Sequence, residues 1–337
     1  MLQQDSFLTI RLSIVLKKVS SKIPAIVIFA PTASGKTALT RELFSPAGSH
    51  FILNAEIISA DSQAVYKKMD IGTAKPEPDF CRQIPHHLID VKNPDEQFTV
   101  ADFVFMADKA CKEIYSRGKI PVICGGTGFY IRNFLYGLPP TPESDPKIRT
   151  ELQNRIAKEG NAALYEELKS VDMESAKVIN VNDAYRICRA LEVYYTTGKT
   201  RSSYKIIPQI RTQYDFTFIV LEPPKELLYE RIKSRVDQMF ADGLENEIKM
   251  LKSAGYTKVS PGMKAIGYSE WFENDLDDYT LDDIEQIKAD IKHHSCKYAK
   301  KQYTYIRDIP GSIIIPYEGR EEDIEKVQAV IKNQLIG

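Results

Sequence analysis

Apolar and polar positions along this chain follow one repeated order: a short apolar run, a turn, and then a stretch with helical spacing. Residues 25–29 form the first apolar run, and helical spacing begins after the turn, at residues 37–43. Two further apolar runs, residues 56–59 and 120–124, lead into turns in the same way. Because strands that alternate with helices pair in parallel, this order predicts an α/β fold with a parallel sheet flanked by helices.

The pattern changes after a proline-rich turn at residues 139–142. Helical periodicity with charged faces then continues until strand-like spacing returns at residues 216–221. The second part of the core is predicted to hold long helices at residues 225–252 and 284–308 and a last strand at 313–315. The predicted division is into an N-terminal extension that is poorly ordered, a core in two parts and an inserted all-helical subdomain, at residues 1–24, 25–140 with 209–337, and 141–208.

Composition excludes some classes of protein without selecting one. The chain has 43% hydrophobic and 27% charged residues, which is an ordinary globular mixture. The net charge of −1 means that any nucleic-acid surface must come from local clusters of Lys and Arg. No apolar run approaches the roughly 18 residues of a membrane span, so we expect a soluble, cytoplasmic protein with no membrane partner. The five cysteines show no paired metal-ligand spacing, and their number is odd for disulfides, so they fit reduced thiols.

The first turn carries a phosphate-binding pattern. Residues 30–37 match G-x-x-x-x-G-K-[ST] except that alanine replaces the first glycine, which is tolerated where the backbone φ is negative. Between a strand and a helix, such a loop offers backbone N–H groups to phosphate oxygens, with Lys36 neutralising charge and Thr37 ligating Mg²⁺. The candidate phosphate-binding residues are Ala30, Pro31, Thr32, Ala33, Ser34, Gly35, Lys36 and Thr37. The loop predicts a P-loop NTPase-like core and, alone, favours a kinase or NTPase.

Two further turns at strand ends are predicted to face this loop, because ligands of parallel sheets bind beyond the carboxyl ends of the strands. Asp61 could hold Mg²⁺ through water, accept a proton as a general base, or only cap the next turn. Thr127, in the turn of residues 125–128, could reach into the same site. Arg231 and Arg235 share one helical face and suit a diphosphate, although a solvated face explains them equally well.

Several segments, taken in order, resemble the tRNA dimethylallyltransferase family, also called tRNA isopentenyltransferases, of the bacterial type. The resemblance spans about residues 25 to 308 and rests on the segments at residues 31–37, 60–63, 69–76, 85–90, 125–128, 189–194, 265–268 and 298–302. It implies that the phosphate loop binds dimethylallyl diphosphate, with Mg²⁺ as the only cofactor, and that the carbon chain is transferred to N6 of the adenosine 3′ of the tRNA anticodon. Asp61 then matches the general base, Thr127 a threonine that assists at the reaction centre, and Arg149 a basic residue near the tRNA. These three residues are the candidate catalytic residues.

The resemblance also implies which residues contact tRNA. The helical insertion would hold the anticodon stem-loop, and a monomer suffices for a ligand of this size. The residues that match the tRNA-contacting stretches of the family are Asp61, Ser62, Gln63, Ala64, Tyr185, Arg186, Arg189, Lys264, Gly267, Tyr268, Lys300, Lys301, Gln302 and Arg307. The chain departs from the family pattern at Ala30, at Lys264 and Lys301, where arginine is frequent, and at Tyr305, where tryptophan is common.

Three other functions are compatible with parts of the sequence. A small-molecule kinase would transfer phosphate from ATP and would need no dimethylallyl diphosphate. An adenylate dimethylallyltransferase would modify free nucleotide, which needs no clamp such as the predicted insertion. A non-catalytic RNA-binding protein would bind tRNA whether or not Asp61 is intact.

Overall fold

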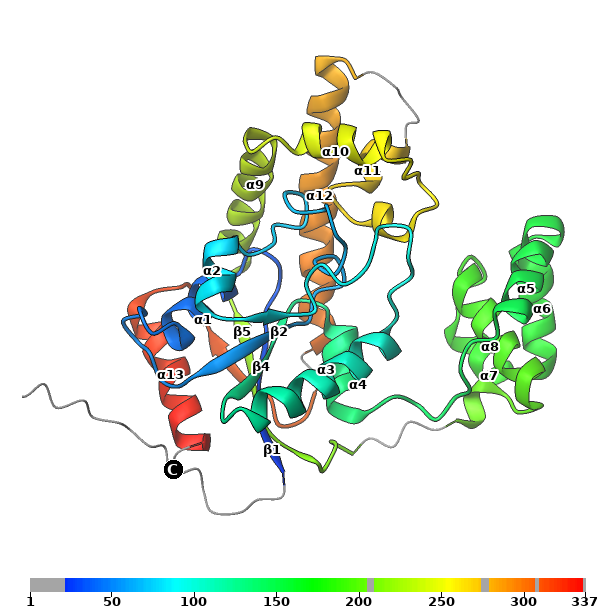
Figure 1. Cartoon of the computed structure of the whole chain (residues 1–337). Coiled ribbons are helices and arrows are strands. Elements are labelled where there is room, and N and C mark those ends of the chain that lie inside the picture. Colours follow the sequence, from blue (N-terminus) through cyan, green and yellow to red (C-terminus); the bar gives the residue numbers. More distant parts are fainter. Residues whose placement is uncertain (1–21, 205–208, 274–278, 307–308, 336–337) are drawn as a thin grey trace, which may run out of the picture. The chain divides into compact units, whose positions relative to one another are not determined.

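Six parallel strands form the centre of the fold in this computed structural model (Figure 1). The structure describes residues 22–204, 209–273, 279–306 and 309–335, so most of the expected N-terminal extension and the candidate Arg307 lie outside the described residues. The sheet order is β3-β2-β4-β1-β5-β6. The strands are β1 (Ile23–Phe29), β2 (Ala55–Ser59), β3 (His86–His87), β4 (Ile120–Gly125), β5 (Tyr214–Glu222) and β6 (Ile313–Pro316). The predicted parallel α/β fold is confirmed, as is each strand that the apolar runs predicted.

Helices cover both faces of this sheet, because successive side chains of each strand point to opposite sides. Ile26 and Ile28 share one buried cluster with side chains from the first and last helices, whereas the third helix packs against β1, β2 and β4. The helices of this part are α1 (Lys36–Phe44), α2 (Pro78–Gln83), α3 (Val100–Ser116), α4 (Gly128–Tyr136), α9 (Lys225–Ala241), α10 (Leu244–Ser253), η2 (Pro261–Lys264), α11 (Ser269–Glu273), α12 (Leu281–Ile306) and α13 (Glu321–Leu335).

The chain divides into two compact units, and the smaller one is an insertion in the larger. Residues up to Leu135 and from Arg211 onward form the larger unit, and Tyr136–Ile210 form the smaller. The backbone N–H of Arg211 donates to the carbonyl oxygen of Leu135 at 2.9 Å, and the Arg211 guanidinium pairs with Asp108 at 2.6 Å. Leu135 and Arg211, the residues of the larger unit that flank the insertion, are therefore held together.

The smaller unit is helical and has its own core. Leu152, Leu164, Leu168, Ile187 and Leu191 lie in one buried cluster that no strand enters. Asp145 and Asp183 begin two of its helices, because their carboxylates accept backbone N–H groups of the first turn. Its helices are α5 (Pro146–Glu159), α6 (Asn161–Val171), α7 (Met173–Val178), α8 (Ala184–Thr197) and η1 (Arg201–Ser203).

One predicted element is wrong. The expected single helix over residues 225–252 is two helices, α9 and α10, which are separated at Gly243. Gly243 adopts a left-handed backbone with φ of 96°, a conformation that ends a helix and that glycine adopts at little cost. The amphipathic pattern continues across this break because both helices bury one face, so periodicity alone does not reveal it.

In the described part of the chain, no helix combines the length and the apolar character that crossing a membrane requires.

Candidate active site

The phosphate loop connects β1 to α1 and folds as its pattern predicts. Ala30 is buried and keeps a negative φ, so its Cβ is accommodated where the usual pattern has glycine. Ala33 and Gly35 have φ of 58° and 93°. Glycine adopts this conformation readily, but for Ala33 it costs about 1 kcal/mol, which the surrounding structure must offset. Alternation of left-handed and ordinary backbone conformations is typical of the concave turns whose N–H groups bind anions.

Lys36 lies at the start of α1 and folds back over this loop. Its ammonium group donates to the carbonyl oxygen of Pro31 at 3.2 Å. Burial lowers the pKa of Lys36, and the nearby Arg235 lowers it further, whereas Cys124 and Asp61 act in the opposite direction. A cation held in this way, half-buried and close to a second cation, is well placed to pair with a polyanion.

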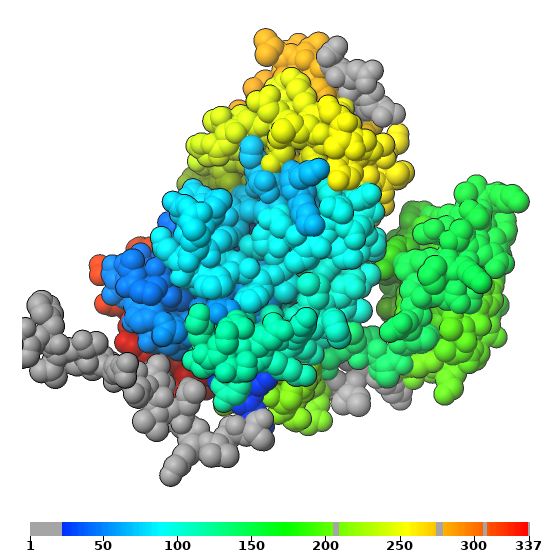
Figure 2. Space-filling view, viewed as in Figure 1, coloured from blue at the N-terminus to red at the C-terminus, as the bar shows by residue number. Residues whose placement is uncertain are grey.

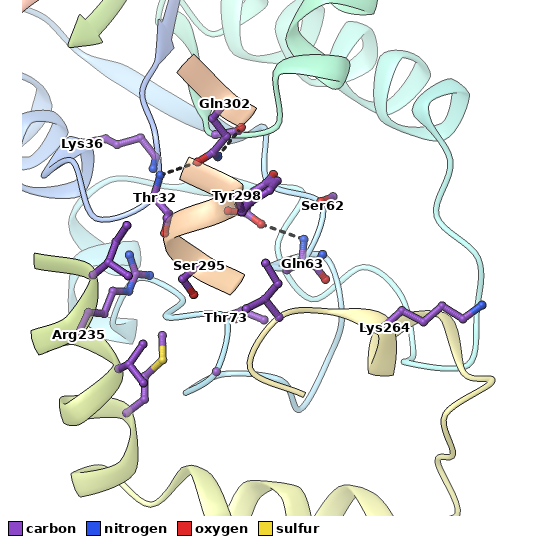
Figure 3. Close-up of a pocket in the computed structure, with 17 residues that line it drawn as sticks. Thr32, Lys36, Ser62, Gln63, Thr73, Arg235, Lys264, Ser295, Tyr298 and Gln302 are labelled. Carbon is purple, nitrogen blue, oxygen red and sulfur yellow. Dashed lines mark hydrogen bonds between the residues drawn. The ribbon is translucent and has the colours of Figure 1, made fainter. Parts of the chain in front are cut away.

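A cleft with two chambers opens beyond the carboxyl ends of the strands. The larger chamber has a volume of about 300 Å³ and the smaller about 110 Å³. Five residues line both chambers, namely Thr32, Lys36, Asp61, Thr73 and Arg235. Figure 3 shows Lys36 and Arg235 on one side of the larger chamber, and Lys264 on the opposite side with its amine directed away. The two chambers therefore meet where the candidate base and two cations come together.

Asp61 follows β2 and uses its carboxylate in part to hold the next turn. Oδ1 accepts the backbone N–H groups of Gln63 at 2.8 Å and Ala64 at 3.3 Å. Among the described residues, no donor is bonded to Oδ2. The capping role considered from the sequence is thus present, and it leaves the second oxygen available to accept a proton.

Thr127 lies beside Asp61 and supports the same turn. Its hydroxyl oxygen accepts the backbone N–H of Ser62 at 3.0 Å, and its own N–H donates to Ala60 at 3.0 Å. Tyr298 of α12 lines the larger chamber close to both residues. Burial and the charge of Asp61 raise the pKa of Tyr298 to about 12, so its hydroxyl stays protonated and can donate a hydrogen bond.

The two candidate arginines of α9 have different surroundings. Arg235 lines both chambers, and burial lowers its pKa while Asp61 raises it. Arg231 instead donates to two carbonyl oxygens, those of Ser34 at 3.4 Å and Glu318 at 2.6 Å. Arg231 therefore braces the phosphate loop against the C-terminal segment, whereas Arg235 faces the space where a diphosphate would lie.

The residues expected to contact tRNA are divided between exposed and buried positions. Lys300 and Lys301 are exposed on α12, but Gln302 is buried and lines the larger chamber. Tyr268 is fully buried, and its hydroxyl donates to Glu247 at 2.6 Å. The contacts with tRNA themselves stay predictions for all of these residues.

Glu247 of α10 organises the loop that closes the larger chamber. Its carboxylate accepts the backbone N–H groups of Asp70, Ile71 and Gly72 at 2.8, 2.8 and 3.2 Å, in addition to the Tyr268 hydroxyl. Figure 2 shows the light blue segment around these loop residues lying against the yellow segment that contains α10. Burial and the neighbouring carboxylate raise the pKa of Tyr268.

In the smaller unit, Arg149 and Tyr185 form a stacked pair. The Arg149 guanidinium carbon lies 4.7 Å from the centroid of the Tyr185 ring, and Tyr185 is 61% exposed. Arg186 is also exposed, whereas Arg189 donates to Pro142 and pairs with the buried Glu192. Arg149 and Tyr185 thus place a cation over an aromatic ring that is largely exposed to solvent. The catalytic role assigned to Arg149 stays a prediction.

Some residues of the cleft were not assigned a role from the sequence. Tyr298 and Thr73 lie within motifs that carried the family resemblance, so the motifs could have indicated them. Glu247 and the apolar side chains of α9 that line the cleft lie outside those motifs, and their roles depend on tertiary contacts.

Comparisons with known proteins give one consistent set of relatives. The family model for IPP transferase matches residues 64–309. A tRNA dimethylallyltransferase of Geobacter sulfurreducens is 38% identical over 91% of this chain and 96% of its own. The crystal structure of a full-length tRNA isopentenylpyrophosphate transferase from Bacillus halodurans is 32% identical with a TM-score of 0.64, covering 93% and 97% of the two chains. A eukaryotic dimethylallyltransferase, captured crystallographically acting on tRNA, is 27% identical with a TM-score of 0.76, covering 93% and 80%.

Proposed function

The chain belongs to the IPP transferase family of tRNA dimethylallyltransferases, and from that premise we propose how its cleft carries out the reaction. The enzyme is a prenyltransferase that transfers a dimethylallyl group to tRNA. We assign the donor as dimethylallyl diphosphate and the acceptor as N6 of the adenosine 3′ of the anticodon. The observation that carries this assignment of roles is the meeting of Lys36, Asp61 and Arg235 at the junction of two chambers.

The diphosphate of the donor binds at the phosphate loop. Backbone N–H groups of the loop and the N-terminus of α1 hold its oxygens, and Lys36 and Arg235 neutralise its charge. On this proposal Lys36 exchanges its bond to the Pro31 carbonyl for one to phosphate. Arg231 keeps the loop in shape through the Ser34 carbonyl and need not touch the donor.

The residues of the smaller chamber fit a magnesium ion. Thr37 is exposed there, close to Ser59 and Asp61, which together offer hydroxyl and carboxylate oxygens. Within the described residues, no group of three His, Cys, Asp or Glu side chains is arranged to hold a metal. Mg²⁺ suits such a sparse site because it keeps several waters and takes further oxygens from substrate phosphates. When bound, it would neutralise charge on the leaving diphosphate.

The chemical step exchanges one bond at C1 of the dimethylallyl group. The N6 nitrogen forms a bond to C1 while the bond from C1 to the diphosphate oxygen breaks, and that electron pair leaves with the diphosphate. N6 loses one proton, which the free Oδ2 of Asp61 accepts. Gln63 and Ala64, which donate to Oδ1, keep the carboxylate oriented during the transfer. Thr127 positions the turn through its bond to Ser62, and Tyr298 offers a hydroxyl group from the lining of the larger chamber.

The acceptor base must leave its stack to enter the cleft. We propose that the insertion holds the anticodon stem-loop through its exposed cations and through the stacked pair of Arg149 and Tyr185. On the larger unit, the exposed Lys264, Lys300 and Lys301 supply phosphate contacts. One chain offers all of these groups, so we propose a monomer as the active form.

The test is transfer of labelled dimethylallyl diphosphate to unmodified tRNA with Mg²⁺, followed by mass analysis of the nucleosides. Three variants are compared with the wild type: Asp61→Asn, Lys36→Ala, and Asp95→Asn as an exposed control. Asparagine can still accept the N–H groups of Gln63 and Ala64 but cannot take a proton. We therefore expect kcat to fall by about 10²–10⁴-fold with donor binding retained, whereas Lys36→Ala should weaken donor binding itself.

The outcomes separate the proposal from its alternatives. Prenylated adenosine in tRNA, absent from the Asp61→Asn reaction, supports the assigned roles. Labelling of free AMP in preference to tRNA would replace the acceptor, and consumption of ATP without prenyl transfer would replace the reaction. Full turnover by Asp61→Asn would remove Asp61 as the base.

A further inference from the structure

One wall of the larger chamber is apolar and lies directly beside the diphosphate site. Ile232, Val236 and Met239 of α9 line this chamber, and each is at most 9% exposed. They are spaced i, i+4 and i+7, so their side chains share the helix face that also presents Arg235. A helix thus offers one cation and a continuous apolar stripe to the same cavity, which is the complement of an allylic diphosphate.

The two chambers differ in what they can hold. The smaller chamber is lined by Thr37, Ser59, Lys75 and His86, which suits phosphate oxygens and a hydrated cation. Gln63 and Lys264 lie on one side of the larger chamber, and α9 with Arg235 forms the opposite side (Figure 3). If the acceptor base enters beside Gln63 and Lys264, the hydrocarbon of the donor is left to pack on the apolar stripe of α9.

The stripe has a defined start and end. Ile232 is buried in a cluster with Leu228 and Ala299, against which Ala33 of the phosphate loop packs, so the stripe begins at the loop. Met239 is seven residues further along the helix, or about 10 Å at the helical rise per residue. From Arg235, which marks the diphosphate, Met239 is only about 6 Å away along the axis. One five-carbon unit beyond the diphosphate fits within this distance. A second unit would add four bonded carbons, or roughly 5 Å, and would extend past Met239.

We propose that Met239 is the end wall of the donor site and limits the transferred chain to five carbons. The proposal rests on the proposed function and assigns a specificity-determining residue within it. A ten-carbon allylic diphosphate would have to displace the Met239 side chain, whereas the dimethylallyl group stops short of it. A well-packed interior resists the insertion of extra atoms, so the longer donor is rejected at binding.

The test compares dimethylallyl diphosphate with geranyl diphosphate as donors to unmodified tRNA. Met239→Ala removes the three terminal heavy atoms of the side chain and should raise the ratio of kcat/KM for geranyl over dimethylallyl diphosphate at least tenfold. Met250→Ala is the matched control, because Met250 lies on α10 with its side chain 66% exposed. That variant should keep the wild-type ratio.

A second variant tests the wall from the other direction if Met239→Ala does not fold. Met239→Phe enlarges the end of the stripe and should raise the KM for dimethylallyl diphosphate at least fivefold without changing the affinity for tRNA. An unchanged donor ratio in folded Met239→Ala, or an unchanged KM in Met239→Phe, would overturn the proposal while dimethylallyl transfer by the control persists. Absence of dimethylallyl transfer in both wild type and control would instead contradict the proposed function.

Discussion

Gln302 on α12 accepts, through Oε1, a hydrogen bond from the backbone N–H of Thr32 at 3.1 Å, although 270 positions separate them in the chain. The same side chain donates through Nε2 to the carbonyl oxygen of Gly126 at 2.7 Å. A Cβ on Gly126 would lie 2.4 Å from this Nε2, so a side chain at this position would displace the amide. One buried amide therefore ties the phosphate loop to the glycine-rich turn that carries Thr127.

Replacing Gln302 by leucine should loosen the phosphate loop. The N–H of Thr32 and the carbonyl of Gly126 would lose their partners, which costs about 2–4 kcal/mol of stability. The KM for dimethylallyl diphosphate should rise at least fivefold, because the loop is no longer held in its binding shape. Urea unfolding and steady-state kinetics measure both effects. Gln286→Leu, on an exposed position of the same helix, is the matched control, and equal behaviour of the two variants would contradict the bridging role.

Replacing Glu247 by alanine should destabilise the loop at residues 70–72. Three backbone N–H groups and the Tyr268 hydroxyl would lose a shared buried acceptor, so we expect a loss of at least about 3 kcal/mol in the free energy of unfolding. Gly72 and Thr73 line the larger chamber, so turnover should fall as well. Glu245→Ala on the same helix controls for the loss of a carboxylate, because Glu245 accepts a hydrogen bond from the exposed Lys249 and none from the loop. A melting temperature equal to that of this control would show that the loop is held by other contacts.

Glu56 should make the stability of the enzyme depend on acidic pH. Burial alone would raise its pKa, but hydrogen bonds from Lys119, His87 and Arg117 lower it to about 2, against an ordinary value of 4.5. The folded protein therefore binds fewer protons than the unfolded chain in this range. The contribution of Glu56 to the free energy of unfolding is fully present above about pH 4.5 and is lost as the pH falls towards 2. The upper limit of this contribution is about 3 kcal/mol, and the solvent exposure of Arg117 and Lys119 reduces it.

Urea unfolding at pH 7 and pH 3 tests this linkage. Glu56→Gln should lose less stability between the two pH values than the wild type loses. Glu113→Gln, which alters an exposed carboxylate of α3, should follow the wild type. Parallel pH profiles for all three proteins would mean that other carboxylates govern the acid response.

Replacing Tyr185 by alanine should weaken tRNA binding and leave the donor site unchanged. If an unstacked base packs on the pair formed with Arg149, its loss should cost about 1–3 kcal/mol, or roughly 5–150-fold in the Kd for tRNA. Tyr185→Phe keeps the ring and should retain most of the affinity. Filter binding of tRNA and the KM for dimethylallyl diphosphate give the two readings. Equal tRNA affinity of the alanine and phenylalanine variants would exclude stacking at this position.

Several features of this protein are determined by short stretches of its sequence. Except for the two-residue β3, the parallel strands were predictable, as was the phosphate loop, because hydrophobic periodicity and the backbone needs of a tight turn involve only neighbouring residues. The family resemblance added the transfer of a dimethylallyl group to tRNA, which the comparisons confirm. The motif order also indicated that Asp61 and Thr127 follow strands, and the structure brings these two residues together through Ser62.

Other features were decided only by the tertiary structure. Arg231 and Arg235 occupy the same helix face, yet one braces carbonyl groups and the other faces the cleft. The bridge from Gln302 to Thr32 and the apolar wall that ends at Met239 likewise depend on segments far apart in the chain. Periodicity states which side of a helix is buried, but the partner that covers it is chosen by packing, and the packed partner determines whether a side chain braces a loop, binds a ligand or ends a cavity.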